Sequence, residues 1–408
     1  MLVLQHGEEQ DTCKEVQVAR NWPKMIQLVS TSIDHCIRAG SSQICSPSTL
    51  LLYICRRAMF KFDFEIDDED KTADFLLPKE AELEPSPSQI EQVEPFAEHT
   101  LPALLERLPP LISYSPLTIS DAASNVTLAR RDLFDARFQL ISGGRGDVES
   151  ESADSALEFL DAPSDLVPGV YEGGLKTWEC SVDLAGYLDT LGNDKGSRFA
   201  GKRVLEIGCG TAVPSIFILS RLFNGVQDVE TVVAFQDYNA SVLELITFPN
   251  VVLAWYMSPA SEEFRNSATD SELSAADPTV AGELNITPEL KTAFLDSLRR
   301  HKISLLFYSG PWQSLTAHLT EKYDVILTSE TIYRSESLAH LIALLRAACA
   351  GPASQPLCLV AAKVLYFGVG GGVSEFVDAV QKDHKGRVET VWEKKAGVGR
   401  SILEVTWP

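Results

Sequence analysis

The feature that most constrains this chain is an alternation of short apolar, β-rich runs with helical patterns after Pro168. Five runs predict strands, at residues 202–208, 231–237, 303–309, 324–329 and 356–367, and two more follow at 387–393 and 401–407. Apolar residues at helical spacing lie between them, at 211–222, 239–246, 336–350 and 373–382. Near-continuous apolar strands are covered on both faces, and no helical pattern separates the last two strands. The pattern therefore predicts an α/β, Rossmann-like fold: a seven-stranded, mostly parallel sheet with one antiparallel strand and helices on both faces.

Composition divides the chain into three segments. Residues 1–58 hold four of the eight cysteines and lack sustained periodicity, so we interpret them as an extension whose order and place in the native product are open. Residues 59–165 are acidic and proline-containing, which predicts a partly disordered N-terminal region. Residues 166–408 form the predicted α/β domain, and the polar, aperiodic stretch 258–302 predicts a disordered insertion within it.

The overall charge and the cysteine spacing narrow the functional classes. A net charge of -22 argues against direct nucleic-acid binding and favours a basic protein partner. No apolar run approaches the roughly 18 to 20 residues that span a bilayer, so we expect no membrane contact. No two of the eight cysteines are spaced as C-x-x-C, which leaves a zinc site without support. Without a signal or transit peptide, we expect reduced thiols in the cytoplasm and nucleus.

The run VLEIGCGTA places two glycines, Gly208 and Gly210, between the first strand and the next helix. Glycines there let the backbone approach a ligand at a helix N-terminus. The dinucleotide fingerprint requires glycine where this chain has Val213, so nicotinamide binding is disfavoured. Glu206 is costly to bury without a partner, and we interpret it as the partner of a ligand's ammonium group. The alternative is a carboxylate that braces the loop or caps the helix.

Polar and aromatic residues also follow the second and third strands. Asp237 ends the second strand, where a ribose diol is bound in doubly wound sheets, and Tyr238 and Asn239 come next. After the third strand and the turn at Gly310, Trp312 is placed to close an adenine pocket. Core packing is the alternative for either aromatic residue alone. Because the carboxyl ends of parallel strands meet at one sheet edge, we expect these groups to share a ligand site.

A Gly-Gly turn precedes a helical pattern that begins near Thr177, which we predict to be its N-cap. Trp178 and Glu179 then lie in the first turn, facing the same sheet edge, with a buried structural tryptophan as the alternative. The fourth strand runs into TSETIY, which carries Ser329, Glu330 and Tyr333. Glu330 alone is explained equally by an exposed loop or by the negative charge that a helix N-terminus favours.

Taken in order, EGGLKTWEC, VLEIGCGTA, FQDYN, FPNVV, YSGPW, YDVILTSETIY and YFGVGGGV resemble the eukaryotic protein-histidine N-methyltransferases. These are a branch of the seven-strand, class I methyltransferases that use S-adenosyl-L-methionine. The resemblance covers about residue 167 to the C-terminus, so 166–408 is predicted to be a class I methyltransferase domain. It implies S-adenosyl-L-methionine as the cofactor, whose ammonium group we take as the partner of Glu206.

The resemblance also implies the roles of individual residues. Cofactor contacts are implied for Thr177, Trp178, Glu179, Cys180, Ser181, Gly208 with its neighbour Gly210, Asp237, Tyr238, Asn239, Trp312 with the preceding Gly310, and Ser329. The implied substrate is one histidine of a large-subunit ribosomal protein, methylated on the tele nitrogen. Glu330 and Tyr333 match the D/E-x-x-Y/F pattern of related protein methyltransferases, so we predict that both are catalytic.

The chemistry of the acceptor fits this hypothesis. Histidine titrates near ~6.5 and is mostly neutral in the cell, whereas deprotonating a lysine near ~10.4 costs roughly 4 to 5 kcal/mol. A histidine enzyme therefore needs alignment more than a strong base, and a carboxylate such as Glu330 can orient the ring. Two alternatives stay open: a lysine methyltransferase of the same superfamily, and a non-catalytic module that binds ribosomal proteins during ribosome assembly. We expect a monomer.

Overall fold

A computed structural model describes residues 94–119, 123, 125–136, 139, 173–191, 198–267, 276–351, 355–366, 371–383 and 385–408. The predicted extension at residues 1–58 lies outside these residues, as do residues 59–93 of the acidic region.

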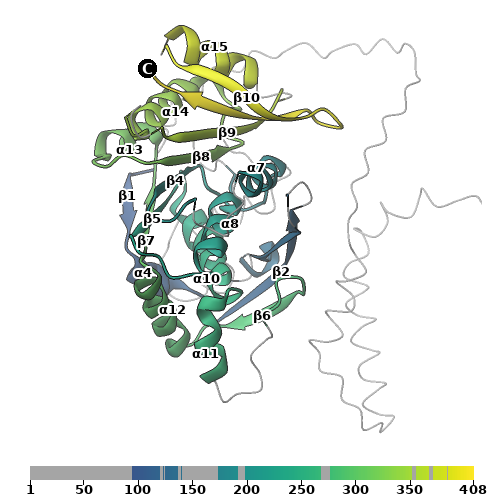
Figure 1. Cartoon of the computed structure of the whole chain (residues 1–408), viewed down its shortest axis with the longest axis vertical. Helices are drawn as coiled ribbons and strands as arrows, with labels where there is room; N and C mark the ends of the chain where they lie inside the picture. The colour runs from purple at the N-terminus through teal and green to yellow at the C-terminus, as the bar shows by residue number, and fades with distance from the viewer. Residues whose placement is uncertain are drawn as a thin grey trace, which may run out of the picture. The chain divides into compact units, whose positions relative to one another are not determined.

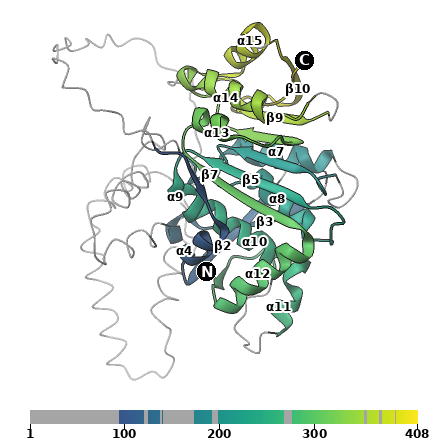
Figure 2. The same ribbon diagram turned by 90° about the vertical axis from the view of Figure 1, so that its left-hand side faces the viewer.

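The central sheet confirms the predicted fold class (Figures 1 and 2). Its order is β1-β7-β5-β4-β8-β9-β11-β10. The strands are β1 (Ala97–His99), β4 (Arg203–Ile207), β5 (Thr231–Asp237), β7 (Ile303–Ser309), β8 (Val325–Ser329), β9 (Leu357–Lys363), β10 (Arg387–Lys394) and β11 (Arg400–Thr406). Strands β7, β5, β4, β8 and β9 pair in parallel, and β11 is antiparallel to both β9 and β10.

Strand β1 was not predicted, and β9 ends earlier than predicted. Residues 97–99 pair antiparallel with β7 and add an eighth strand from the acidic region. Strand β9 ends at Lys363, and Leu365 instead forms an isolated antiparallel bridge with Gly372. From β4 the chain builds one side of the sheet through β5 and β7, then crosses to β8 on the other side. This reversal leaves a crevice at the carboxyl ends of the strands, where such sheets bind ligands.

Helices cover both faces of the sheet. Successive residues along a strand point to opposite faces, and both faces of the central strands are apolar. Val204 packs in the cluster that includes α7 (Glu179–Thr190), α8 (Val213–Leu222) and α10 (Phe248–Tyr256). Leu205 packs in the cluster that includes α13 (Trp312–His318), α14 (Ser335–Ala348) and α15 (Val373–Asp383). Helix α10 continues from α9 (Ala240–Val242) through the π-helical turn η1 (Leu243–Thr247).

A second sheet joins the acidic region to the insertion. It has the order β3-β2-β6, from β2 (Leu111–Ile119), β3 (Val126–Arg131) and β6 (Gly282–Asn285), and α4 (Leu101–Arg107) precedes it. Arg131 anchors this sheet: its backbone N–H donates to Asn250 Oδ1 at 2.8 Å and its guanidinium to the Leu245 carbonyl at 2.6 Å. Residues of the predicted acidic region thus pack on the same body as the main sheet.

The predicted disorder of the insertion is wrong for much of residues 258–302. The described parts form η2 (Pro259–Ser261), α11 (Glu262–Ser267), β6 and α12 (Pro288–His301). The side chain of Thr287 caps α12 through the N–H of Leu290 at 3.2 Å. Phe294 then packs edge-on against Trp255, with ring centroids 5.5 Å apart. A few apolar residues at helical spacing were enough to dock a mostly polar helix.

Among the described residues, no single helix is long and apolar enough to cross a membrane. The bent pair of helices at 240–256 and 259–267 meets the length and composition requirement only when the two are taken together.

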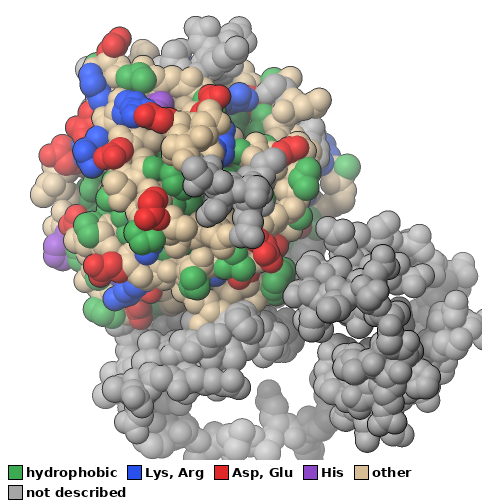
Figure 3. Space-filling view, turned by 90° about the horizontal axis from the view of Figure 1, so that it is seen from below, with side chains coloured by type: hydrophobic (Ala, Val, Ile, Leu, Met, Phe, Trp, Pro, Cys, Tyr) green, Lys and Arg blue, Asp and Glu red, His purple; other side chains and the backbone are tan. Residues whose placement is uncertain are grey.

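On the face in Figure 3, acidic and basic side chains are interspersed with hydrophobic ones. The net negative charge is therefore not gathered into a single patch on that face.

Candidate active site

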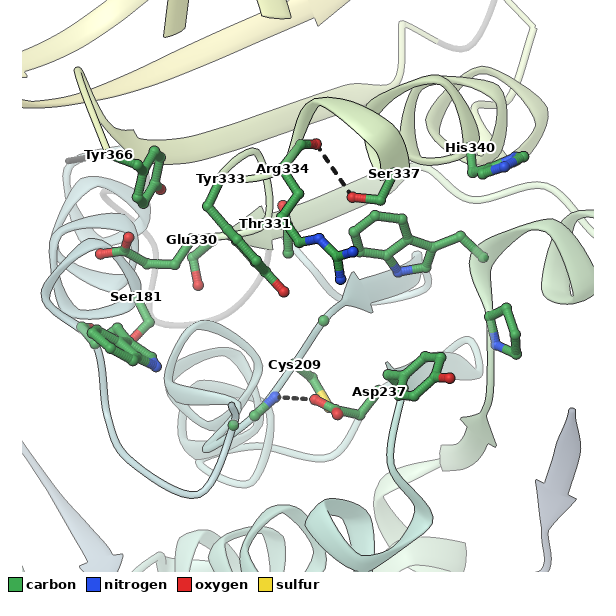
Figure 4. A pocket seen from close by; sticks show the side chains of 18 of the residues that line it. Ser181, Cys209, Asp237, Glu330, Thr331, Tyr333, Arg334, Ser337, His340 and Tyr366 are labelled. Atoms are coloured by element: carbon green, nitrogen blue, oxygen red, sulfur yellow. Dashed lines mark hydrogen bonds between the residues drawn. The ribbon is translucent and has the colours of Figure 1, made fainter. Parts of the chain in front are cut away.

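A cavity of about 330 Å³ lies at the carboxyl ends of the central strands (Figure 4). Figure 4 shows Asp237 and Cys209 on one side of it and Glu330 and Tyr366 on the other, with the Tyr333 hydroxyl pointing into the space between. This size suits a small organic ligand. Among the described residues, His, Cys, Asp and Glu side chains form no group that could hold a metal ion.

The loop between β4 and α8 depends on its glycines. Gly208 has φ +60°, and a Cβ there would lie 2.6 Å from Thr331 Cγ2. Gly210 has φ +50°, and a Cβ there would lie 3.1 Å from Gly174 Cα. Only glycine takes such conformations without strain and leaves room for these close approaches. The N–H of Gly210 donates to Asp237 Oδ2 at 2.9 Å, so this loop is tied to the end of β5.

Gln236, which sequence reasoning missed, connects three strand ends. Its side-chain oxygen accepts the Gly208 N–H at 3.1 Å and the Trp312 indole N–H at 3.0 Å. Its side-chain nitrogen donates to the Gly310 carbonyl at 2.9 Å. The available signal was a polar amide in the otherwise apolar β5, just before Asp237. Gln236 thereby fixes the glycine loop relative to one aromatic wall of the cavity.

Residues 94–99 pack behind the aromatic end of the cavity. The Glu94 N–H donates to the Tyr238 hydroxyl oxygen at 3.2 Å, and Tyr238 lines the cavity. His99 Nε2 lies 2.8 Å from Ser309 Oγ at the end of β7. Gly310 has φ +104°, and a Cβ there would lie 2.8 Å from Phe96 Cα. A segment outside the predicted methyltransferase domain therefore supports the site.

The turn before α7 supplies part of the wall, although its cap differs from the prediction. The N-cap is Trp178, without a side-chain hydrogen bond, and Thr177 instead donates to Thr211 Oγ1 at 3.1 Å. Trp178 and Ser181 line the cavity, and Ser181 Oγ donates to the Trp178 carbonyl at 2.7 Å. Cys180 lies behind them, and burial, followed by the nearby Glu330, raises the pKa of its thiol.

Glu206 does not line the cavity, which differs from its predicted contact with a cofactor ammonium. It is buried, with only 1% of its surface exposed, and its Oε2 accepts the Ser215 N–H at 2.9 Å. Burial raises the pKa of Glu206 to about 8. It braces the first turn of α8, which was the alternative interpretation. The sequence alone does not reveal whether a carboxylate in β4 faces the ligand cavity or the first turn of α8.

The opposite end of the cavity holds an ionic cluster. Glu330, directly after β8, has φ +58°, a left-handed conformation that is unusual for a residue other than glycine and concentrates at functional sites. Its Oε1 lies 3.6 Å from Lys363 Nζ at the end of β9. Lys363 also lies 3.4 Å from Glu179 Oε2 and 4.9 Å from the centre of the Trp178 ring.

Two tyrosines complete this end. The rings of Tyr333 and Tyr366 meet edge to face, with centroids 6.3 Å apart. Burial, and next the charge of Glu330, raise the pKa of Tyr366, so its hydroxyl stays protonated. Burial alone would raise the pKa of Glu179, but backbone hydrogen bonding and Lys363 lower it overall. The cluster thus combines ionised carboxylate, ammonium and neutral phenol groups beside one cavity.

Curated relatives cover most of this chain. It is 32% identical over 308 residues to histidine protein methyltransferase 1 of Schizosaccharomyces pombe, a match that covers 74% of this chain and 82% of that protein. The protein of the same name in Saccharomyces cerevisiae is 33% identical over 293 residues, covering 68% of this chain and 75% of the relative. The chain belongs to the histidine protein methyltransferase 1 family. The resemblance seen in the sequence motifs is confirmed.

Other comparisons add less to the histidine protein methyltransferase 1 assignment. The Bos taurus homologue of that name is 33% identical, over 60% of this chain and 58% of its own. No protein-family model matches. Magnesium protoporphyrin IX methyltransferase from Synechocystis PCC 6803 with bound SAM is 11% identical, with a TM-score of 0.32 over 66% of this chain and 91% of that one. A likeness of that size supports no conclusion about this chain.

The structure gathers most, but not all, of the predicted site residues of this histidine protein methyltransferase 1 family member around one cavity. Those that line it are Trp178, Ser181, Gly208, Gly210, Asp237, Tyr238, Trp312, Ser329, Glu330 and Tyr333. Those that do not are Thr177, Glu179, Cys180, Glu206, Asn239 and Gly310. Asn239 is buried, and its N–H donates to Asp237 Oδ1 at 3.3 Å. Lining residues that were not predicted include Gly174, Lys176, Cys209, Thr211, Arg334, Lys363 and Tyr366.

Proposed function

We propose that this protein is an S-adenosyl-L-methionine-dependent protein-histidine N-methyltransferase that modifies the tele nitrogen of a histidine in a large-subunit ribosomal protein. Membership of the histidine protein methyltransferase 1 family supports the reaction class. The single structural observation that carries the proposal is Glu330, held in a left-handed conformation beside aromatic rings in the same cavity as the glycine loop. The ribosomal acceptor and the tele nitrogen come from the resemblance of the sequence motifs.

The cavity has a chemistry that suits the cofactor. The glycine loop brings backbone close to the Asp237 carboxylate, a suitable acceptor for ribose hydroxyls. Tyr238 and Trp312 offer flat faces for an adenine ring. When bound, S-adenosyl-L-methionine supplies a methyl group activated by its sulfonium. The glycine loop, Asp237, Tyr238 and Trp312 would hold it, and Trp178 and Ser181 would bound its other end.

The protein's main contribution is then alignment, which can supply on the order of 7 to 11 kcal/mol of the barrier. In our proposal the acceptor imidazole enters beside Glu330, between Trp178, Tyr333 and Tyr366. A neutral imidazole carries one N–H, and donating it to Glu330 directs the other ring nitrogen into the cavity. The same carboxylate stabilises the positive charge that develops on the ring. No strong base is required, because histidine is mostly neutral near pH ~7.

The charge of the chain bears on its partner. The net charge of -22 favours a basic ribosomal protein over direct contact with nucleic acid. We propose that the protein acts as a monomer in the cytoplasm and nucleus, where ribosomal proteins are made and assembled.

Replacing Glu330 tests the proposed chemistry. The E330Q variant keeps the side-chain size but removes the charge, and a hydrogen bond to a charged group is worth about 1.5 to 3 kcal/mol. We expect methyl transfer to ribosomal protein to fall about 10-fold to 100-fold, with cofactor affinity unchanged in calorimetry. The control is E263Q on α11, whose carboxylate pairs with Arg300 and is 75% exposed. Full turnover by E330Q would refute the assigned role.

A further inference from the structure

Lys363 occupies an unusual position in the candidate active site. It ends β9, and its side chain is only 18% exposed. Its ammonium lies 3.4 Å from Glu179 Oε2, 3.6 Å from Glu330 Oε1 and 4.9 Å from the centre of the Trp178 ring. These partners come from α7, from the turn that precedes it and from the residue that follows β8. The start of α7, with Trp178 and Glu179, and the end of β8, with Glu330, therefore converge on one ammonium group at the cavity.

Two carboxylates and the face of an indole ring are the groups that proteins use to bind a cation. Here that cation cage, formed by Glu179, Glu330 and Trp178, is already filled by the chain's own lysine. A protonated lysine from a substrate would seek the same three partners and would meet the charge of Lys363 there. A neutral imidazole would not, because a carboxylate has two oxygens with several acceptor positions and can receive a ring N–H while it stays beside Lys363.

We propose that Lys363 determines acceptor specificity: by filling the cation cage, it makes the site reject protonated amines and admit a neutral imidazole. This inference rests on the proposed function, because it places the acceptor beside Glu330. It also separates the two methyltransferase hypotheses, since a lysine methyltransferase must first admit a protonated amine. Lys363 is therefore a positioning residue: its charge decides which acceptor binds beside Glu330, and it takes no part in bond making.

The test measures binding of two small probes to the full chain loaded with S-adenosylhomocysteine, by saturation-transfer NMR. The probes are imidazole and n-butylammonium, which represent the two acceptor side chains. We expect the wild type to bind imidazole in preference to n-butylammonium. In K363M the emptied cage should bind n-butylammonium at least about tenfold more tightly than in the wild type, since like charges brought together oppose binding strongly.

Two controls separate charge from structure. K363R keeps the positive charge and should keep the wild-type preference. K382M removes an exposed lysine of α15 that pairs with Asp378, and it should also match the wild type. Thermal melting verifies that each variant is folded, and K363Q replaces K363M if the latter does not fold.

The outcomes are distinct for this inference and for the proposed function. An unchanged preference in K363M or K363Q overturns the role of Lys363, and so does a wild type that fails to bind imidazole. Failure of the wild type to methylate any histidine would contradict the proposed function, while the probe-binding result would still report on the cation cage.

Discussion

Gln236→Leu is the substitution whose effect can be worked out most fully from the structure. Gln236 is 1% exposed, and leucine has a similar size, so the change removes hydrogen bonds without opening a large cavity. Three groups would lose their partner: the Gly208 N–H, the Gly310 carbonyl and the Trp312 indole N–H. Gly208 follows β4, and Gly310 and Trp312 follow β7, so the groups belong to two strand ends at the cavity. The substitution therefore acts on the site and on stability together.

The expected size follows from the cost of leaving buried polar groups unsatisfied. That cost is about 1 to 3 kcal/mol for each group, and effects within one network are not additive. We therefore expect Q236L to lower the free energy of unfolding by about 3 to 5 kcal/mol. Because the glycine loop and Trp312 lose their common anchor, we also expect cofactor affinity to fall about tenfold, which corresponds to 1.4 kcal/mol.

Urea unfolding and calorimetric titration with S-adenosylhomocysteine measure the two effects. The control is Q227L, because Gln227 also donates its amide to two carbonyls, those of Leu222 and Gly225. It precedes β5, whereas the cavity lies at the carboxyl end of that strand, and it does not line the cavity. We expect Q227L to change stability by less than about 1 kcal/mol and to leave affinity unchanged. A Q236L variant with a stability loss below about 1 kcal/mol and normal cofactor affinity would refute the assigned role.

Three further substitutions test other contacts. Because burial raises the pKa of Glu206 from 4.5 to about 8, the stability that its proton provides is full below pH 4.5 and is lost as pH rises through 8. In urea unfolding, the free energy of unfolding of E206Q should match that of the wild type near pH ~4.5 and exceed it by about 2 to 5 kcal/mol near pH ~9. A difference that does not change with pH would contradict this. G310A should melt at a lower temperature than G397A. Both glycines have positive φ, but only at Gly310 would a Cβ collide with backbone atoms. Equal melting temperatures would argue against that collision. D183A should cost about 3 to 5 kcal/mol in urea unfolding, since it leaves the largely buried Arg400 guanidinium without its carboxylate. D183A with R400M should recover part of that loss, and a loss below about 1 kcal/mol in D183A alone would show that the pair contributes little.

Residue patterns within single strands predicted the central sheet well. The apolar runs gave seven strands of the main sheet, and the polar residues that follow them, such as Asp237 and Glu330, do face one cavity. The reason is that burial on both faces and the meeting of carboxyl ends at one edge are properties of the fold class. For these residues, the pattern within each strand was therefore enough to predict the position in the fold.

Other features depend on contacts between distant parts of the chain, and sequence reasoning missed or misplaced them. Strand β1 has three residues and exists through its pairing with β7, which no periodicity within so short a run reveals. Helix α12 was assigned to disorder because its polar composition hid the few residues that dock it. Lys363 ends β9, but the predicted strand at 356–367 runs past it, so the rule that pointed to Glu330 after β8 did not point to Lys363.

In our proposal, the cavity transfers a methyl group from S-adenosyl-L-methionine to histidine. The most direct measurement is incubation of the full chain with S-adenosylmethionine labelled in its methyl group and with large-subunit ribosomal proteins, followed by acid hydrolysis and identification of the labelled amino acid. We expect label in tele-methylhistidine from one ribosomal protein. Label in methyllysine, or no incorporation by a chain that binds the cofactor, would contradict it.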